Sequence, residues 1–145
     1  MGKKKVAQKS GDQASGDAAA PKAAVKETSK KYERGRAYVN ASYNNTVISM
    51  TDEKGNVLAW GSAGSLGFTG PKKATPFAAS KVVAALAEKL RKSGPVHIEV
   101  LLNGVGGGRD SAVRSLANQG FDVLSIKDVT PIPHNGPRQR KVRRI

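Results

Sequence analysis

Apolar and polar residues alternate along residues 37–43, and this period of two predicts a strand with one buried face. Two further strands are predicted over residues 46–51, which are rich in β-branched side chains, and over residues 56–60. The positions between them, 44–45 and 52–55, carry residues that favour tight turns. Three short strands joined by short turns predict an antiparallel meander.

The apolar pattern then changes to the period of a helix. Thr75 and Pro76 predict the start of this helix, because threonine caps a helix N-terminus and proline suits the first helical position. Apolar residues recur on one helical face as far as Leu90, and Gly94 with Pro95 is expected to end the helix.

The remaining segments predict strand, helix and strand again. Residues 96–102 form a strongly apolar strand, and residues 121–126 form the last strand. Asp110 and Ser111 are expected to cap a short helix between them, which Gly120 ends. Strand–helix–strand connections are right-handed and join parallel strands. The predicted fold class is therefore α/β, a single mixed five-stranded sheet with two helices, in which two parallel crossovers follow the meander.

Composition and charge divide the 145-residue chain into three parts. The whole chain has 25 Lys+Arg against 11 Asp+Glu, a formal net charge of +14. Residues 1–34 contain almost no large apolar side chain and are expected to be a disordered basic extension. Residues 35–129 are expected to form a compact domain. Residues 130–145 contain five basic residues, no acidic residue and three prolines, which predicts an extended basic arm.

The N-terminal extension has two interpretations, a solubilising tail or a polybasic arm that becomes ordered on nucleic acid. The chain has no cysteine, which excludes disulfides and thiolate metal sites. No apolar run reaches the roughly 18 residues that a membrane span requires, and no hydrophobic stretch follows the first lysines. We therefore expect neither a membrane partner nor a secretory signal.

The basic arm is the main candidate binding site, because guanidinium groups pair well with phosphate oxygens. The expected phosphate contacts are Arg138, Arg140, Lys141, Arg143 and Arg144. Closer contacts to RNA are expected from His134, Asn135 and Gly136.

The glycine-rich loop over residues 104–108 is a second candidate. It lies between a strand and a helix, but the dinucleotide and P-loop fingerprints are both absent, which argues against a nucleotide site. An RNA backbone could approach at Gly106 and Gly108, beside the charge of Arg109. A helix-entry loop that needs glycine for its backbone conformation is an equally good interpretation.

A first glycine-rich loop and the turn at residues 44–45 are weaker candidates. Phe68 beside Lys72 and Lys73 has the chemistry for base stacking with phosphate contact, or Phe68 could fill the core instead. Asn44 and Asn45 could hydrogen-bond bases or riboses, although a tight turn requires such residues in any case.

Catalytic chemistry finds little support in the sequence. His97 lies in an apolar strand, and both His97 and Trp60 are expected to be core residues. The acidic residues are scattered, whereas two-metal nuclease chemistry needs clustered carboxylates. We therefore predict a non-enzymatic protein with no cofactor and no metal site.

Several separated motifs together resemble one known family. The most specific is DVTPIPHNG at residues 128–136, followed by the basic end. ASYNNTVISMTDEKGN at 41–56 and GFTGPKKATPFAA at 67–79 occur in the same order as in that family. From about residue 35 to residue 145, the chain resembles the universal ribosomal small-subunit protein eleven family in its bacterial-type form.

The resemblance implies a structural constituent of the small ribosomal subunit that supports translation. It implies that the chain binds and bridges helices of the small-subunit ribosomal RNA on the platform, near the Shine–Dalgarno cleft. Implied neighbours are small-subunit proteins seven and eighteen, with messenger RNA and initiation factor three nearby, in the cytoplasmic ribosome. The implied fold is ribonuclease H-like without the catalytic carboxylates. The chain departs from the family's usual loop residues at Thr69, Val105 and Gly107.

Two other classes of function stay open on the sequence alone. A histone-like DNA-compacting protein would explain the Lys- and Ala-rich extension, although compaction needs no ordered α/β domain with two glycine loops. A nucleotide-dependent enzyme would use the loop at 104–108, although that loop lacks the known fingerprints.

Overall fold

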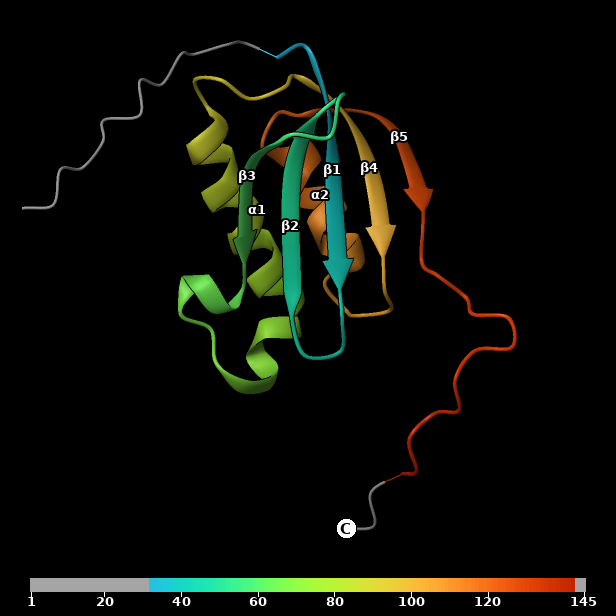
Figure 1. The fold of residues 1–145 in the computed structure, drawn as a ribbon. Coiled ribbons are helices and arrows are strands. Elements are labelled where there is room, and N and C mark those ends of the chain that lie inside the picture. Colours follow the sequence, from blue (N-terminus) through green and yellow to red (C-terminus); the bar gives the residue numbers. More distant parts are fainter. Residues whose placement is uncertain (1–31, 143–145) are drawn as a thin grey trace, which may run out of the picture.

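The computed structural model describes residues 32–142, so the predictions for residues 1–31 and for Arg143 and Arg144 lie outside the described residues. Figure 1 shows one twisted sheet backed by two helices. The elements are β1 (Arg34–Ala41), β2 (Thr46–Asp52), β3 (Val57–Ser62), the short 3-10 helices η1 (Gly64–Leu66) and η2 (Gly70–Ala74), α1 (Pro76–Leu90), β4 (His97–Asn103), α2 (Arg109–Asn118) and β5 (Asp122–Asp128).

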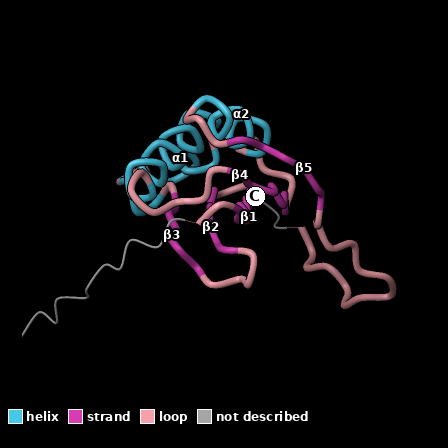
Figure 2. The backbone as a smooth tube through the Cα atoms, turned by 90° about the horizontal axis from the view of Figure 1, so that it is seen from above, coloured by secondary structure: helices cyan, strands magenta, loops and turns pink. Residues whose placement is uncertain are grey.

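The sheet has the strand order β3-β2-β1-β4-β5. β1 pairs antiparallel with β2, and β2 pairs antiparallel with β3, whereas β4 is parallel to both β1 and β5. The predicted mixed five-stranded α/β sheet with a meander and two parallel crossovers is therefore confirmed. Both α-helices lie on the same face of the sheet (Figure 2), so no α-helix of residues 32–142 covers the other face.

The core lies between the two helices and this one face of the sheet. Alternate residues of the strands point into it, which explains why one residue is fully buried and the next is exposed along β1. Each large apolar side chain buried here stabilises the fold by about 1.5–3 kcal/mol. The largest fully buried apolar side chains include Ile48, Met50, Leu86, Ile98 and Leu116.

The two helices begin in different ways. α1 begins as predicted, with Pro76 at its first position and the Thr75 hydroxyl accepting a hydrogen bond from the Ala78 amide at 3.3 Å. The predicted cap of α2 is wrong, because this helix begins at Arg109 and its N-cap is Gly108, which has no side chain to act as a cap. Asp110 instead lies within the first turn, where its charge suits the positive end of the helix.

Two residues expected in the core are not there. Trp60 is 59% exposed, because its neighbour Gly61 faces α1 and consecutive strand residues point to opposite sides. The side chain of His97 is 44% exposed, and its Nδ1 lies 2.7 Å from a carboxylate oxygen of Asp122. The apolar residues of β4 that enter the core are the alternate ones that follow His97, beginning with Ile98.

Candidate nucleic-acid interface

The segments predicted to bind RNA converge at one end of the sheet. β1, β3, β4 and β5 all finish at this end, and both helices begin there, as Figure 1 shows at the bottom of the view. The connecting segments 42–45, 63–75 and 104–108 therefore lie together, and the chain beyond β5 leaves from the same side. We call these three segments, with residues 129–142, the arm end.

Hydrogen bonds tie the segments of the arm end together. The Gly106 amide donates to the Ala41 carbonyl at 2.8 Å, which joins the second glycine loop to the end of β1. The Ala63 amide donates to the Thr46 carbonyl at 3.0 Å, which joins the first loop to the start of β2. The three loops are thus joined to one another through the adjacent ends of β1 and β2.

The glycines of the second loop lie against the chain itself. A Cβ atom placed on Gly106 would lie 2.2 Å from the Ser42 carbonyl oxygen, and one on Gly108 would lie 2.5 Å from the Thr46 hydroxyl. Both glycines are buried, whereas Val105 and Gly107 are exposed. Close packing within the protein is therefore sufficient reason for glycine at 106 and 108, and an RNA contact at these two positions stays a prediction.

The turn between β1 and β2 is closed by a serine. The Ser42 amide donates to the Asn45 carbonyl at 2.9 Å, and the Ser42 hydroxyl accepts from the Asn45 amide at 3.0 Å. Asn44 is exposed and Asn45 is half-buried. The side-chain oxygen of Asn45 is buried and accepts no hydrogen bond from the residues described. The turn therefore presents Asn44 to the outside, where its predicted contact with RNA would have to form.

In the first glycine loop, the aromatic ring packs inward, whereas the lysines are accessible to solvent. Phe68 packs against the core, and its ring meets that of Phe77 edge-on at a centroid distance of 6.0 Å. This packing favours the core interpretation of Phe68 over a stacking role. Lys72 is exposed and Lys73 is half-exposed in η2, and neither forms an ion pair with any residue of 32–142. The two lysines thus have the accessibility that a phosphate contact requires.

Arg109 joins the glycine loop to the base of the arm. Its guanidinium donates to Asp128 at 2.6 Å and to the Gly104 carbonyl at 2.7 Å. Asp128 also accepts from the amide and the hydroxyl of Thr130, at 2.9 Å and 2.6 Å. The Thr130 hydroxyl in turn accepts from the Gly104 amide at 3.1 Å. We call these four residues the arm latch, since they bind the first residues of the arm to the domain.

The electrostatics of the arm latch follow from these contacts. The side-chain hydrogen bonds from Thr130 and from Arg109 hold the pKa of Asp128 well below its usual range. The side chain of Arg109 is only 25% exposed, so its charge serves mainly within the protein. Sequence reasoning missed this arrangement, although Asp-x-Thr is a spacing at which an Asp side chain accepts from the backbone two residues later.

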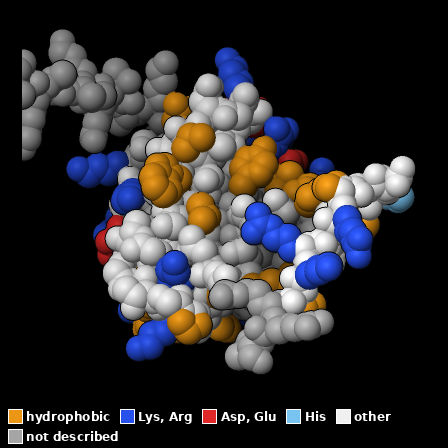
Figure 3. All heavy atoms as spheres, turned by 60° about the horizontal axis from the view of Figure 1, so that its bottom comes forward, with side chains coloured by type: hydrophobic (Ala, Val, Ile, Leu, Met, Phe, Trp, Pro, Cys, Tyr) orange, Lys and Arg blue, Asp and Glu red, His pale blue; other side chains and the backbone are white. Residues whose placement is uncertain are grey.

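Beyond the latch the arm is extended and exposed. Residues 131–142 form no helix or strand, and every one of them is exposed. Asn135 has a left-handed backbone with φ of 54°, which turns the chain next to Gly136. Figure 3 shows Lys and Arg side chains on this arm and around the neighbouring surface, with few acids between them. The exposed cations of the described arm are Arg138, Arg140 and Lys141.

Comparisons with known proteins place the chain in a family. A sequence model described as "Ribosomal protein S11" matches residues 35–144. Two proteins named "Small ribosomal subunit protein uS11", from two strains of Treponema pallidum, are each 51% identical to this chain over 120 residues. The match covers 83% of this chain and 94% of each relative. The chain belongs to the ribosomal protein S11 family. The family resemblance inferred from the separated motifs is thereby confirmed.

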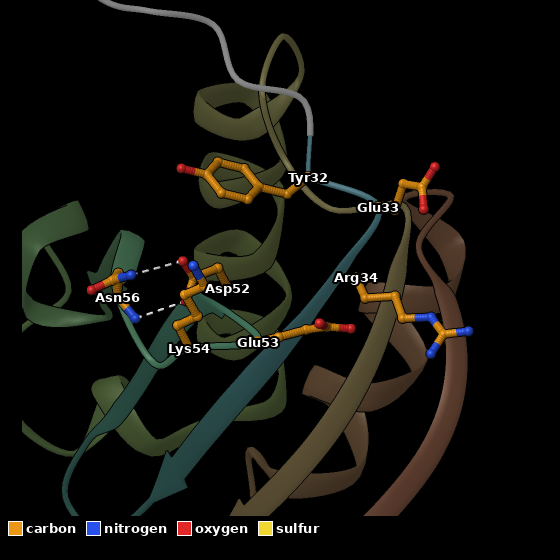
Figure 4. A pocket seen from close by; sticks show the side chains of 7 residues that line it. All are labelled: Tyr32, Glu33, Arg34, Asp52, Glu53, Lys54 and Asn56. Atoms are coloured by element: carbon orange, nitrogen blue, oxygen red, sulfur yellow. Dashed lines mark hydrogen bonds between the residues drawn. The ribbon is translucent and has the colours of Figure 1, made fainter.

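The opposite end of this S11-family domain has a different chemistry. An open depression of about 710 Å³ lies there, where β1 begins and the β2–β3 turn folds over (Figure 4). Glu33 and Glu53 line it together with Asp52, whose pKa is lowered mainly by the hydrogen bond from the Asn56 side chain at 2.8 Å. Two cations, Arg34 and Lys54, also line the depression, but the three carboxylates outnumber them. Because carboxylates repel phosphates, the arm end is the better candidate site for RNA.

Within residues 32–142, no three His, Cys, Asp or Glu side chains are grouped so that they could hold a metal ion. The helices of the same region are all too short or too polar to cross a bilayer.

Proposed function

We propose that this S11-family chain is a structural constituent of the small ribosomal subunit, and that its arm end binds the small-subunit ribosomal RNA. The observation that carries the proposal is the convergence of three loops and a cationic arm at one end of one sheet. That end exposes Lys72, Arg138, Arg140 and Lys141, whereas carboxylates such as Glu33 and Glu53 lie among the cations of the opposite end.

Phosphate neutralisation supplies much of the affinity of such a surface. Each cation that pairs with a phosphate releases a counterion, so the logarithm of the affinity falls linearly with the logarithm of the salt concentration. An extended arm with few internal hydrogen bonds can follow the groove between two RNA helices, while the compact loops contact one of them. In this way the domain and the arm bridge RNA helices without catalysing a reaction.

Membership of the family supports a proposed position within the subunit. The chain lies on the platform near the Shine–Dalgarno cleft, with small-subunit proteins seven and eighteen as neighbours and messenger RNA and initiation factor three nearby. It acts in the cytoplasmic ribosome. Residues 35–129 are the compact RNA-binding domain and residues 130–145 are the arm.

The test is the incorporation of variants into small subunits reconstituted from the remaining components. A chain that lacks residues 130–145 is expected to keep the fold of its domain, measured by circular dichroism, and to incorporate less well at matched salt. The control is the full chain with Arg91→Gln and Lys92→Gln, two exposed cations after α1 at the opposite end. This control is expected to incorporate like the native chain.

Two results would contradict the proposal. If the truncated chain incorporates as well as the native chain, the arm does not contribute to assembly of the subunit. Equal affinity of the native chain for random duplex DNA and for structured small-subunit RNA, measured at the same salt, would favour a DNA-compacting protein instead.

A further inference from the structure

The helix-free face of the sheet carries a row of side chains that crosses all five strands. The strand registers place Trp60 opposite Ser49, Ser49 opposite Tyr38, Tyr38 opposite Leu101, and Leu101 opposite Lys127. Paired residues share one face of a sheet, so these five side chains project from the same side. We call them the transverse row.

The transverse row is not part of the core. Trp60 is 59% exposed and Tyr38 is 37% exposed, and both helices pack on the other face (Figure 2). Two strand spacings separate the two aromatic residues, roughly 10 Å. Ser49 lies between them and is too short to fill the space beside the rings. Both aromatic side chains therefore have surface that a flat ligand can contact.

The row next to the transverse row is mostly polar. The adjacent row towards the arm end contains Ser62, Val47, Asn40 and Asn103, in the order of the strands. Neither row contains an acidic residue, and Lys127 is exposed at the β5 edge. On the other side of the transverse row, the carboxylate of Glu99 lies 3.5 Å from the Arg36 guanidinium, which offsets its charge.

We propose that this face binds a single-stranded segment of RNA, with bases stacked on Trp60 and Tyr38 and a phosphate held by Lys127. Open sheets with exposed aromatic residues are a known way to bind single strands, because every base has a face that can stack. The amides of Asn40 and Asn103 can donate to and accept from base edges. The same face also exposes Val57 and Leu124. A protein partner fits less well than RNA, because Ser49 interrupts the apolar area and amide and charged side chains border it.

The face also continues into the arm end. Asn40 lies one residue before the end of β1, and Asn103 is the last residue of β4, directly before the second glycine loop. A strand of RNA on this face would therefore run towards the surface proposed to bind folded RNA. The proposal goes beyond that function and does not depend on it, because stacking on the sheet and phosphate contacts by the arm can fail separately.

The chain provides its own probe, since Trp60 is its one tryptophan. The full chain is titrated with oligoadenylate of about eight nucleotides, within the usual site size for single strands, and tryptophan fluorescence is recorded. Inorganic polyphosphate of matched charge is the control ligand, because it occupies cationic groups and cannot stack. Salt is kept high enough to weaken binding at the arm. Oligoadenylate is expected to quench the fluorescence and polyphosphate is not.

Variants then test which rings are used. Binding of end-labelled oligoadenylate, measured by anisotropy, is expected to weaken about 5- to 150-fold for Trp60→Ala and for Tyr38→Ala, the range that corresponds to the loss of one stacked base. Phe77→Ala is the matched control, because Phe77 is 62% exposed on α1, away from the sheet face. This control is expected to bind like the native chain, and circular dichroism verifies that each variant is folded.

Several results would overturn the inference. If anisotropy detects binding but tryptophan fluorescence is not quenched, the oligonucleotide binds elsewhere on the protein. If polyphosphate quenches the fluorescence as strongly as oligoadenylate does, the quenching does not come from base stacking. If Phe77→Ala weakens binding as much as Trp60→Ala does, oligoadenylate binding does not depend on the sheet face. If footprinting of assembled subunits shows that another protein, not RNA, covers Trp60, the sheet face is a protein contact.

Discussion

Replacing Gly106 by alanine tests whether the second glycine loop is fixed by packing within the protein. The added Cβ would lie 2.2 Å from the Ser42 carbonyl oxygen and 2.9 Å from the Ala41 carbonyl carbon. Both neighbours are backbone atoms of the chain entering the β1–β2 turn, so no side-chain rotation can relieve the overlap. Gly106 does not have a positive φ, so the expected effect comes from packing and not from backbone strain.

The expected loss of stability can be worked out from two contributions. Overpacking of a close-packed site costs about 1–3 kcal/mol. Moving the loop away from β1 also weakens the hydrogen bond from the Gly106 amide to the Ala41 carbonyl, which contributes about 0.5–1.5 kcal/mol. We therefore expect the free energy of unfolding to fall by about 2–4 kcal/mol. For a domain of this size, that corresponds to a decrease of about 10–25 °C in Tm.

Gly107 is the matched control, because it is the next residue in the same loop. A Cβ placed on Gly107 would lie 3.6 Å from the Ala74 carbonyl oxygen, an ordinary contact, and its φ is also not positive. Gly107→Ala is expected to leave stability unchanged or to raise it by up to about 1 kcal/mol, because alanine restricts the unfolded chain. Urea denaturation followed by circular dichroism measures both variants.

The comparison separates the two interpretations of the loop. Equal stability of Gly106→Ala and Gly107→Ala would refute the packing argument. If both variants were as stable as the native chain and only Gly106→Ala bound ribosomal RNA more weakly, glycine at this position would serve the approach of RNA instead.

Three further predictions follow from the core, the latch and the arm. The lowered pKa of Asp128 contributes stability that is present above its unfolded pKa of about 4 and is lost as the pH falls below it. The urea midpoint of Asp128→Asn should therefore be lower than that of the native chain near pH 7, and the difference between the two midpoints should narrow as the pH falls below about 4. A difference between the midpoints that does not change with pH would contradict this. Arg138→Gln with Arg140→Gln should reduce the steepness of the log–log salt dependence of RNA binding by about 0.9 for each phosphate that is no longer neutralised, measured by filter binding. An unchanged slope would mean that neither arginine pairs with a phosphate. Leu86→Ala should lower the free energy of unfolding by about 2–5 kcal/mol, since Leu86 is 1% exposed. Leu66→Ala, at a site 42% exposed, should change it by less than about 0.5 kcal/mol, and similar losses at both sites would contradict the assignment of the core.

The sequence by itself determined the kind and order of the elements. Alternation marked β1, Thr75 and Pro76 marked the start of α1, and the prolines and cations after Thr130 marked the arm. These signals are local, because strand alternation, helix capping and proline geometry depend on a few neighbouring residues. Separated motifs in the right order were also enough to indicate the S11 family, which the comparisons confirmed.

Only the tertiary structure decided which residues meet and which face they share. Trp60 and Ile48 both lie in strands, but the phase of each strand relative to the helices leaves Trp60 exposed and buries Ile48. Arg109 and Asp128 are 19 positions apart in the sequence, and the parallel crossover brings them within hydrogen-bonding distance. Whether a side chain is exposed, or a charge is already paired, depends on contacts between distant segments, and no local pattern in the chain records those contacts.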